Sequence, residues 1–309
     1  MVTALKHLTI GTIFYNNEWC IDEYFHGLLN LSYPKAYLDL VWVDSSDKDN
    51  TYNRLKSFLK HYGHMYNRVI LRRMKRREYK TVGWMRNIAR ARNKVIQLRD
   101  QSTDLVFIDS DCVPPKDGIH ALLHMIDDLG ADIAGGITIV HGGIAHDRET
   151  GEVTIVPTFS LYHHITKNNT FYPLPFGLTK DGLMGLPIEL RKKIIRVKGM
   201  ACGFMYIRKE VLDVIKFRAS VKLGEDLDFC KQAVEHGFVL MGNTDLWYDH
   251  LHYLYEFKRK RHGWVIRYHG IHPAREKEDR KKLILAMKDK SLIQHGILTL
   301  NGGVVNNGN

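Results

Sequence analysis

The stretch Thr103-Asp104-Leu105-Val106-Phe107-Ile108-Asp109-Ser110-Asp111-Cys112 decides the expected fold. Leu105 to Ile108 are consecutive apolar residues, which is typical of a strand buried on both faces in a parallel sheet. Pro114 and Pro115 follow and permit neither a continued central strand nor an immediate helix. The strand is therefore predicted to end at the aspartates.

Asp109 and Asp111 stand two residues apart, so both carboxylates can face one point beyond the end of a strand. In open α/β sheets this edge binds ligands. Two convergent carboxylates repel each other unless a cation lies between them, and oxygen ligands suit Mg²⁺ or Mn²⁺ bound together with substrate phosphates. The pattern predicts a divalent-metal site, and a solvated turn is the alternative interpretation.

The composition sets outer limits on the function. The chain has 309 residues, 44% hydrophobic and 26% charged, which indicates a globular protein with one large α/β domain or one domain with an extension. Neither a long apolar run nor a signal-peptide pattern is present in the sequence, so a cytoplasmic location is predicted. The four cysteines are widely spaced and suggest neither a disulfide frame nor a thiolate zinc site. The net charge of +11 favours a polyanionic partner, such as nucleotide phosphates, an anionic membrane or nucleic acid.

Alternating strands and helices precede the aspartates. Strands are predicted at 8–15, 38–43 and 68–71, with helices at 20–31 and 51–61 between them. This alternation predicts parallel βαβ units with right-handed crossovers, so Asp44 should lie at the same edge as Asp109. The basic run 72–77 follows, and then a helix at 84–98 whose face carries Arg86, Asn87, Arg90 and Asn93. That face suits either a nucleotide diphosphate or plain solvent.

The second half of the chain contains another acidic pair. Glu225 and Asp226 lie in the first turn of a helix predicted over 227–236, where the helix dipole alone favours acidic residues. The functional interpretation is that one of them is a general base for an acceptor hydroxyl. The segment 255–268 is basic and aromatic and could close over a diphosphate, and a helix at 274–290 and a disordered tail at 301–309 are predicted to follow.

Short motifs in a fixed order give the sequence its resemblance to a known family. They are Tyr15-Asn16-Asn17-Glu18, Trp42-Val43-Asp44-Ser45-Ser46, Ala91-Arg92-Asn93, Phe107-Ile108-Asp109-Ser110-Asp111 and Gly224-Glu225-Asp226-Leu227-Asp228-Phe229. The chain resembles a family-2-type glycosyltransferase over about residues 5–255. The resemblance implies a GT-A-like α/β fold, with a Rossmann-like mostly parallel sheet flanked by helices. It further implies a nucleotide-binding half at 1–115, an acceptor half at 116–255 and a basic C-terminal extension at 256–309.

The resemblance also implies roles for individual residues. Tyr15 and Asp44 would contact the nucleoside, Arg92 would lie near the nucleotide, Asp111 would bind the metal, and Asp109 would contact ribose or the metal. His250 would complete the metal site, with His252 in reserve, and Asp226 would be the general base while Glu225 orients the acceptor.

The expected activity is a Mn²⁺- or Mg²⁺-dependent transfer of sugar from a nucleoside-diphosphate sugar to a hydroxyl acceptor, which could be a saccharide, a lipid-linked molecule or a nucleic acid. The Glu-Asp pair favours inversion over retention. One alternative is a nucleotidyltransferase, which would need a phosphate-cradling Gly-rich loop that the Tyr15 region lacks. Another is a nucleic-acid-binding protein that uses its basic patches.

Overall fold

The structure is a computed structural model, and its described residues are 5–77, 83–146, 153–166, 171–174, 177–178, 184–185, 188–220, 223–251, 255–260, 263–268 and 298–300. The chain divides into two compact units. The first comprises 1–138, 160–173 and 192–249, and the second comprises 139–159, 174–191 and 250–309. The division into a nucleotide half, an acceptor half and an extension stays a prediction. The helix predicted at 274–290, the tail at 301–309 and His252 lie outside the described residues.

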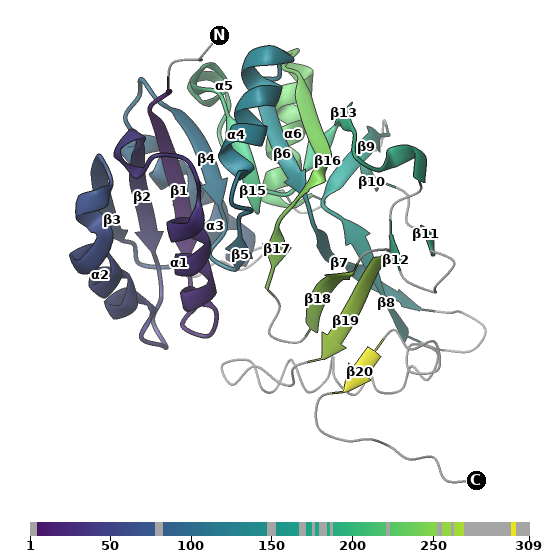
Figure 1. The fold of residues 1–309 in the computed structure, drawn as a ribbon, viewed down its shortest axis with the longest axis horizontal. Coiled ribbons are helices and arrows are strands. Elements are labelled where there is room, and N and C mark those ends of the chain that lie inside the picture. Colours follow the sequence, from purple (N-terminus) through teal and green to yellow (C-terminus); the bar gives the residue numbers. More distant parts are fainter. Residues whose placement is uncertain are drawn as a thin grey trace. The chain divides into compact units, whose positions relative to one another are not determined.

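The first unit begins with alternating strands and helices, as the sequence predicts (Figure 1). Its first half contains β1 (Leu8–Phe14), α1 (Ile21–Asn30), β2 (Leu38–Asp44), α2 (Thr51–Tyr62), β3 (Arg68–Arg73), α3 (Gly83–Leu98), β4 (Asp104–Ile108), β5 (Cys112–Val113), α4 (Gly118–Leu123) and β6 (Ile133–Ile137). A π-helical turn at His124–Asp128 continues α4, and 3-10 turns lie at Lys35–Tyr37 and Gly63–Met65. The later part contains β9 (Leu161–Ile165), β10 (Phe171–Pro173), β13 (Ile194–Arg196), β14 (Gly199–Met200), β15 (Phe204–Ile207), α5 (Lys209–Val214), α6 (Glu225–Glu235) and β16 (Leu240–Trp247). The short strand β17 (Asp249–His250) contains the last residue of this unit and the first residue of the last segment of the second.

An eight-stranded sheet forms the centre of this unit, in the order β13-β16-β6-β15-β4-β1-β2-β3. The strands β4, β1, β2 and β3 pair in parallel, and β16 is parallel to β6. Strand β15 runs antiparallel between β4 and β6. The large, mainly parallel sheet with flanking helices confirms the expected fold class.

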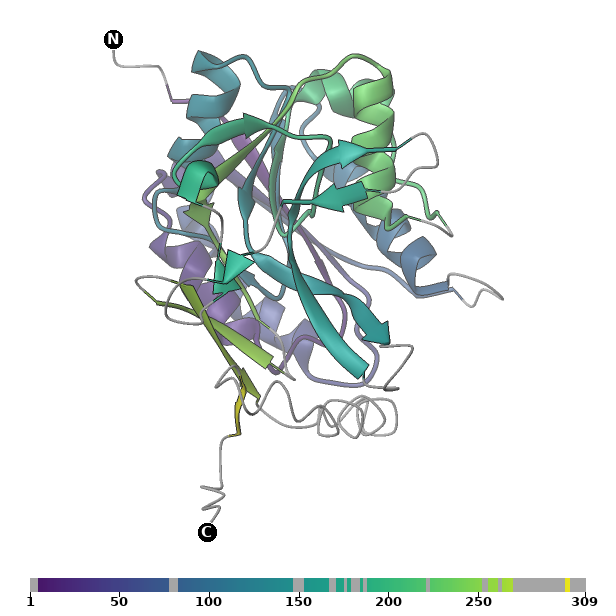
Figure 2. The same ribbon diagram turned by 90° about the vertical axis from the view of Figure 1, so that its right-hand side faces the viewer.

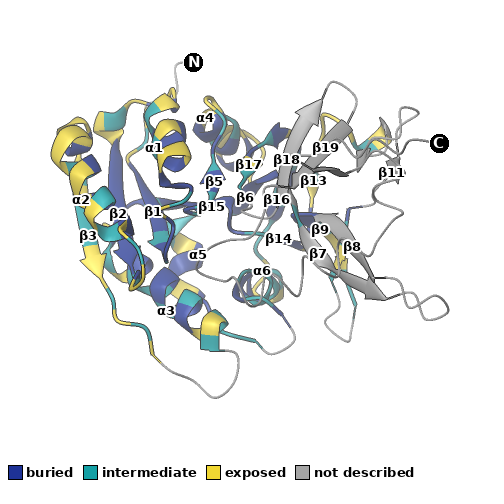
Figure 3. Cartoon of the chain, turned by 90° about the horizontal axis from the view of Figure 1, so that it is seen from below, coloured by how far each residue is buried: buried dark blue, intermediate teal, exposed yellow. Residues whose placement is uncertain are grey.

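Helices cover both faces of the sheet, which explains why its central strands are apolar throughout (Figure 3). Every residue of β2 is buried. On one face, α1, α2 and α4 pack against Trp42 and other alternate strand residues, with Tyr24 and Phe14 in edge contact. On the other face, α3 and α6 lie next to each other (Figure 2). Helices α3 and α6, which are far apart in the sequence, are therefore neighbours in the fold.

Smaller strand groups complete the two units. In the first, β9 pairs with β10 and β14. In the second, β7 (Ile139–His146) pairs with β8 (Val153–Phe159). A further sheet contains β11 (Gly177–Leu178), β12 (Met184–Gly185), β18 (Tyr255–Lys260), β19 (Gly263–Tyr268) and β20 (Leu298–Leu300), and a 3-10 turn lies at Ile188–Leu190. Among the helices described above, none has the length and apolar character to cross a bilayer.

Candidate active site

The carboxyl ends of neighbouring parallel strands carry the first candidate residues. Asp44 is the last residue of β2 and pairs in register with Phe14 at the end of β1. Asp109 directly follows β4, which pairs with the other side of β1. The structure therefore places Asp44 and Asp109 at the same edge of the sheet, which is the edge where open α/β sheets bind ligands.

Arg92 on α3 connects Asp109 to the acidic start of α6. Its Nη1 and Nη2 donate to Oδ1 and Oδ2 of Asp109 at 2.9 and 3.1 Å, and its Nε donates to Oε1 of Glu225 at 3.3 Å. The guanidinium also lies over the rings of Phe107 and Phe217, 5.1 and 5.6 Å from their centroids. A forked pair of this kind fixes the orientation of a carboxylate as well as its charge.

The charges around Arg92 hold it in its ionised form. Burial by itself lowers the pKa of Arg92, but the carboxylates of Asp109 and Glu225 raise it well above the ordinary value. The aspartate pair requires a nearby cation, for which the sequence predicts a metal ion. In the structure the guanidinium of Arg92 neutralises Asp109. The expected contact of Arg92 with the nucleotide, and of Asp109 with metal or ribose, stay predictions.

Asp226 is the second residue of α6 and is partly buried. Its Oδ1 accepts a hydrogen bond from the N–H of Leu227 at 2.7 Å. Burial, and next the negative charge of Glu225, raise the pKa of Asp226 to about 7, although the nearby Arg92 lowers it. A carboxyl group with a pKa near neutrality can take up and release a proton under physiological conditions, which is what a general base requires.

Asp111 stands two residues after Asp109, directly before β5, and is partly buried. The Sγ of Cys112 lies 3.7 Å from Oδ1 of Asp111. A carboxylate suits Mg²⁺ and Mn²⁺, whereas a thiol suits softer ions, so Asp111 fits the expected metal better than its neighbour does. His250 is the first residue of the last segment of the second unit, and its contribution to a metal site stays a prediction.

Asp44 is fully buried. Its Oδ1 accepts from the N–H of Ser46 at 3.2 Å, and its Oδ2 lies 4.0 Å from Nε of Arg73. Burial raises the pKa of Asp44, while the hydrogen bonds from Ser46 and the charge of Arg73 lower it. In this structure, Asp44 therefore supports the turn that follows β2. Its contact with a nucleoside stays a prediction.

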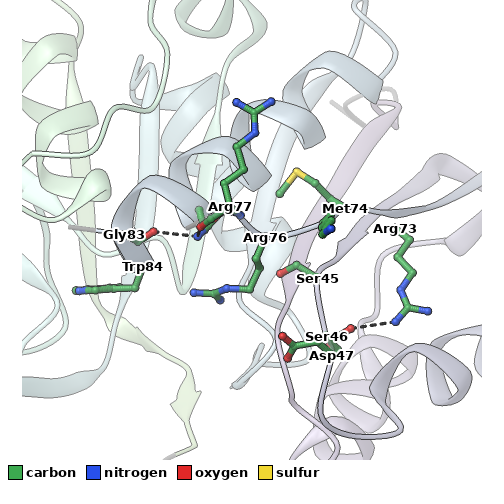
Figure 4. Close-up of a pocket in the computed structure, with 11 residues that line it drawn as sticks. Ser45, Ser46, Asp47, Arg73, Met74, Arg76, Arg77, Gly83 and Trp84 are labelled. Atoms are coloured by element: carbon green, nitrogen blue, oxygen red, sulfur yellow. Dashed lines mark hydrogen bonds between the residues drawn. The ribbon is translucent and has the colours of Figure 1, made fainter. Parts of the chain in front are cut away.

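A cavity of about 690 Å³ opens beside this turn (Figure 4). It is lined by the loop after β2, the end of β3 with the basic loop behind it, and the first turns of α3: Ser45, Ser46, Asp47, Arg73, Met74, Lys75, Arg76, Arg77, Gly83, Trp84 and Asn87. The volume falls within the range of roughly 300–1,000 Å³ found for small-molecule sites. The lining carries several cations and one carboxylate, so the cavity fits an anionic ligand.

The walls of the cavity are held by specific contacts. The guanidinium of Arg76 lies 3.7 Å from the ring centroid of Tyr15. Arg73 donates to the carbonyl oxygen of Ser46 at 3.1 Å (Figure 4). The buried Asn87 donates to the carbonyl oxygens of Arg77 and Gly83 at 2.9 and 3.0 Å. The basic loop therefore has a fixed path up to Arg77, and α3 anchors it.

The predicted nucleotide residues relate to this cavity in different ways. Tyr15 adjoins it through Arg76, whereas Asp44, Arg86 and Arg92 are absent from the described lining. Arg86 is exposed on α3. Asn87 lies on the helix face predicted to suit a nucleotide, whereas Arg76 and Trp84 are not among the predicted site residues. Trp84 is 56% exposed, and a large exposed indole directly after a basic run is the signal that could have drawn attention to it.

The sequence of this chain is similar to that of a known protein family. Residues 9–184 match the family model described as glycosyl transferase family 2. The relative glycosyltransferase AglE of Haloferax volcanii is 23% identical over 151 residues, which cover 48% of this chain and 45% of that protein. The chain thus matches a little under half the length of this relative.

Solved structures share the fold at low sequence identity. The mannosyltransferase PcManGT from Pyrobaculum calidifontis, in complex with GDP-Man and Mn²⁺, has a TM-score of 0.51 and 14% identity, covering 79% of this chain and 56% of that one. GalNAc-T7 with UDP, GalNAc and Mn²⁺ has a TM-score of 0.53 and 15% identity, covering 81% of this chain and 44% of that one. These similarities confirm the expected GT-A fold.

Proposed function

The chain belongs to glycosyl transferase family 2 and is a glycosyltransferase, and from this premise we propose that it transfers a sugar from a nucleoside-diphosphate sugar to a hydroxyl acceptor with inversion at the anomeric carbon. The observation that carries the proposal is the gathering of Asp109, Glu225 and Arg92 from distant parts of the chain, with Asp226 next to them. This arrangement supports Asp226 as the base beside the ligand-binding edge of the sheet.

The cationic cavity is the proposed site of the donor nucleotide. Arg73, Lys75, Arg76 and Arg77 line it, and a nucleoside diphosphate is an anion of suitable size. The PcManGT structure contains GDP-Man, which supports a nucleotide sugar as the donor class.

The proposed cofactor is a divalent cation, with Mn²⁺ favoured over Mg²⁺. Asp111 and His250 would hold it, as the resemblance to the family implies, and carboxylate and imidazole groups both suit Mn²⁺. Both comparison structures described above contain Mn²⁺. When bound, such an ion neutralises charge on the departing nucleoside diphosphate.

The proposed chemistry is a single displacement. The acceptor oxygen attacks the anomeric carbon, the bond from that carbon to the diphosphate oxygen breaks, and Asp226 takes the proton of the acceptor hydroxyl. The pKa of about 7 supports this role, because Asp226 is then ionised in a substantial fraction of molecules at neutral pH. Glu225 is buried against Arg92 and keeps the first turn of α6 in place.

The test is a screen of nucleoside-diphosphate sugars in the presence of Mn²⁺, with release of nucleoside diphosphate as the readout. We expect one donor to be hydrolysed or transferred in preference to the others, and Asp111→Ala to abolish the release. Inversion is checked by the anomeric configuration of the product by NMR. Full activity of Asp111→Ala would contradict the metal assignment, and a retained configuration would contradict the single displacement.

Other expected functions can be separated from sugar transfer by similar measurements. A nucleotidyltransferase would release pyrophosphate, which family membership disfavours. Binding of nucleic acid or an anionic membrane to the basic surface stays a prediction. If such binding occurs, its affinity should fall steeply as the salt concentration rises, and Asp111→Ala should not change it.

A further inference from the structure

Arg92 is more deeply enclosed than a substrate-binding arginine needs to be. Its side chain is 4% exposed, and the rings of Phe107 and Phe217 lie against the guanidinium. Nη1, Nη2 and Nε are all engaged by Asp109 and Glu225. Almost no surface of Arg92 is left to contact a diphosphate. The side chain therefore acts through Asp109 and Glu225.

Given the proposed function, on which this step rests, we infer that Arg92 is a positioning residue that ties the acidic motif after β4 to the acidic motif at the start of α6. The tie joins Asp109 to Glu225, and each of these has a reactive neighbour in the chain. Asp111 stands two residues after Asp109, and Asp226 directly follows Glu225. Arg92 thereby sets the separation between the donor side and the acceptor side of the site.

The geometry requires an arginine at this position. A guanidinium presents its donors in a rigid plane, so it can grip Asp109 with two nitrogens while a third reaches Glu225. A lysine ammonium is a single point charge on a flexible stem and can satisfy one carboxylate at a time. Backbone contacts reinforce the assembly on the β4 side, since the N–H of Asp109 donates to the carbonyl oxygen of Gly203 at 3.1 Å.

The contacts of Arg92 with Asp109 and Glu225 also influence the pKa of Asp226. The charged and titratable groups that act on Asp226 are Glu225, Arg92 and Asp109, and the buried thiols of Cys202 and Cys230 also feel its charge. Glu225 raises the pKa of Asp226 and Arg92 lowers it. A change in the pH profile therefore reports on this network, whereas a purely structural role for Arg92 would leave the profile in place.

The first test is Arg92→Lys, with Arg99→Lys as the matched control. Arg99 directly follows α3, is equally buried, and binds the carbonyl oxygens of Asp100 and Thr103 away from the acidic motifs. Arg92→Lys is expected to lower kcat about 100-fold, the scale of loss for a misplacement of about 1 Å. The donor KM, and the affinity for UDP or GDP measured by calorimetry with Mn²⁺, should be unchanged. Arg99→Lys should retain the wild-type kcat.

Two substitutions of Glu225 decide the question if Arg92→Lys does not fold. Glu225→Gln keeps an oxygen for Nε of Arg92, whereas Glu225→Ala removes the tie. We expect kcat of Glu225→Ala to fall about 100-fold, and Glu225→Gln to recover most of that loss with the acid limb of kcat/KM moved to lower pH. The shift follows because the charge that raises the pKa of Asp226 has been removed.

Several outcomes would overturn the inference. They are an unchanged kcat in Arg92→Lys, a loss confined to the donor KM or to UDP and GDP affinity, or equal kcat losses in Glu225→Ala and Glu225→Gln. Failure of the proposed function looks different, because the wild-type protein would then release no nucleoside diphosphate from any donor in the panel.

Discussion

Asn87 and Arg77 exchange a reciprocal pair of hydrogen bonds, in which the Arg77 N–H donates to Oδ1 of Asn87 at 3.0 Å and Nδ2 of Asn87 donates to the Arg77 carbonyl at 2.9 Å. The partner is a backbone segment that lines the cavity, so Asn87 sets the path of the basic loop. One amide side chain on α3 thus fixes a wall of the proposed donor site.

Asn87→Ala should weaken donor binding and destabilise the fold. The free energy of unfolding should fall by about 0.5–1.5 kcal/mol for each hydrogen bond lost, because the part-buried backbone groups of Arg77 and Gly83 lose their side-chain partner. Asn93→Ala is the control, since Asn93 makes the same reciprocal pair with Phe217, at 2.8 and 3.0 Å, away from the cavity. Both variants should lose stability in thermal melts, but only Asn87→Ala should raise the donor KM. Equal KM values for the two would contradict the assignment of the cavity.

Arg76→Ala should lower nucleotide affinity. Its guanidinium lines the cavity and lies over Tyr15, and a cation–π contact of this kind contributes about 0.5–1 kcal/mol at an exposed site. Loss of this contact together with the charge should raise the dissociation constant for UDP or GDP about threefold to tenfold, measured by calorimetry. Lys56→Ala is the control, because Lys56 lies over the ring of Tyr52 and is absent from the described lining. Tighter binding by Arg76→Ala would show that Arg76 blocks the site.

Asp226→Asn should abolish transfer while sparing donor binding. Removal of a general base costs about 10²- to 10⁴-fold in rate. In the wild-type enzyme, the acid limb of kcat/KM should lie near pH 7, because the pKa of Asp226 is raised to about 7 and its protonated form cannot accept a proton. Steady-state rates between acidic and alkaline pH measure this limb. An acid limb near pH 4 would mean that Asp226 has an ordinary pKa or a different role.

The same substitution should stabilise the protein at alkaline pH. Because burial raises the pKa of Asp226 from 3.8 to about 7, the folded form holds a proton that the unfolded form releases between these values. The contribution of Asp226 to the free energy of unfolding is therefore greatest at low pH, and it declines as the pH rises to about 7. Asp226→Asn should melt at a higher temperature than wild type at pH 8, by about 2–4 °C for each kcal/mol gained. The difference should vanish at acidic pH, and an equal difference at all pH values would refute the linkage.

Metal removal combined with substitution should show that Asp111, and not Cys112, binds the metal. Treatment with EDTA should abolish donor hydrolysis and added Mn²⁺ should restore it, whereas Asp111→Asn should reduce the activity about 100-fold or more at all Mn²⁺ concentrations. Cys112→Ala should keep the wild-type Mn²⁺ dependence, since a thiol suits softer ions than Mn²⁺. A raised Mn²⁺ requirement in Cys112→Ala would identify the sulfur as a ligand.

The strands that carry the site could be predicted, because a run of apolar residues identifies each of them locally in the sequence. The apolar runs of β2 and β4 are buried as expected; β2 ends at Asp44, and Asp109 directly follows β4. Parallel pairing with β1 then brings Asp44 and Asp109 to one edge. The alternation of strand and helix was sufficient for that inference.

The partners of these acids could not be predicted from local patterns. Arg92 and Glu225 are 133 residues apart, and neither carries a signal of the other. The basic run also looks uniform in sequence, although Arg73, Lys75, Arg76 and Arg77 line the cavity and Arg72 is absent from the described lining. Which cations face a cavity depends on the path of the loop, and that path depends on the bonds of Asn87.

The antiparallel strand β15 has a consequence for biosynthesis. It covers one flank of β4, yet a ribosome reaches it only after making everything from β5 to β14. Until Ile207 has emerged, the nascent chain carries an unpaired strand edge in the middle of its future sheet, which is a site for wrong pairing with other chains. A truncation before this strand should therefore yield aggregates, and chaperones have their greatest opportunity during that interval.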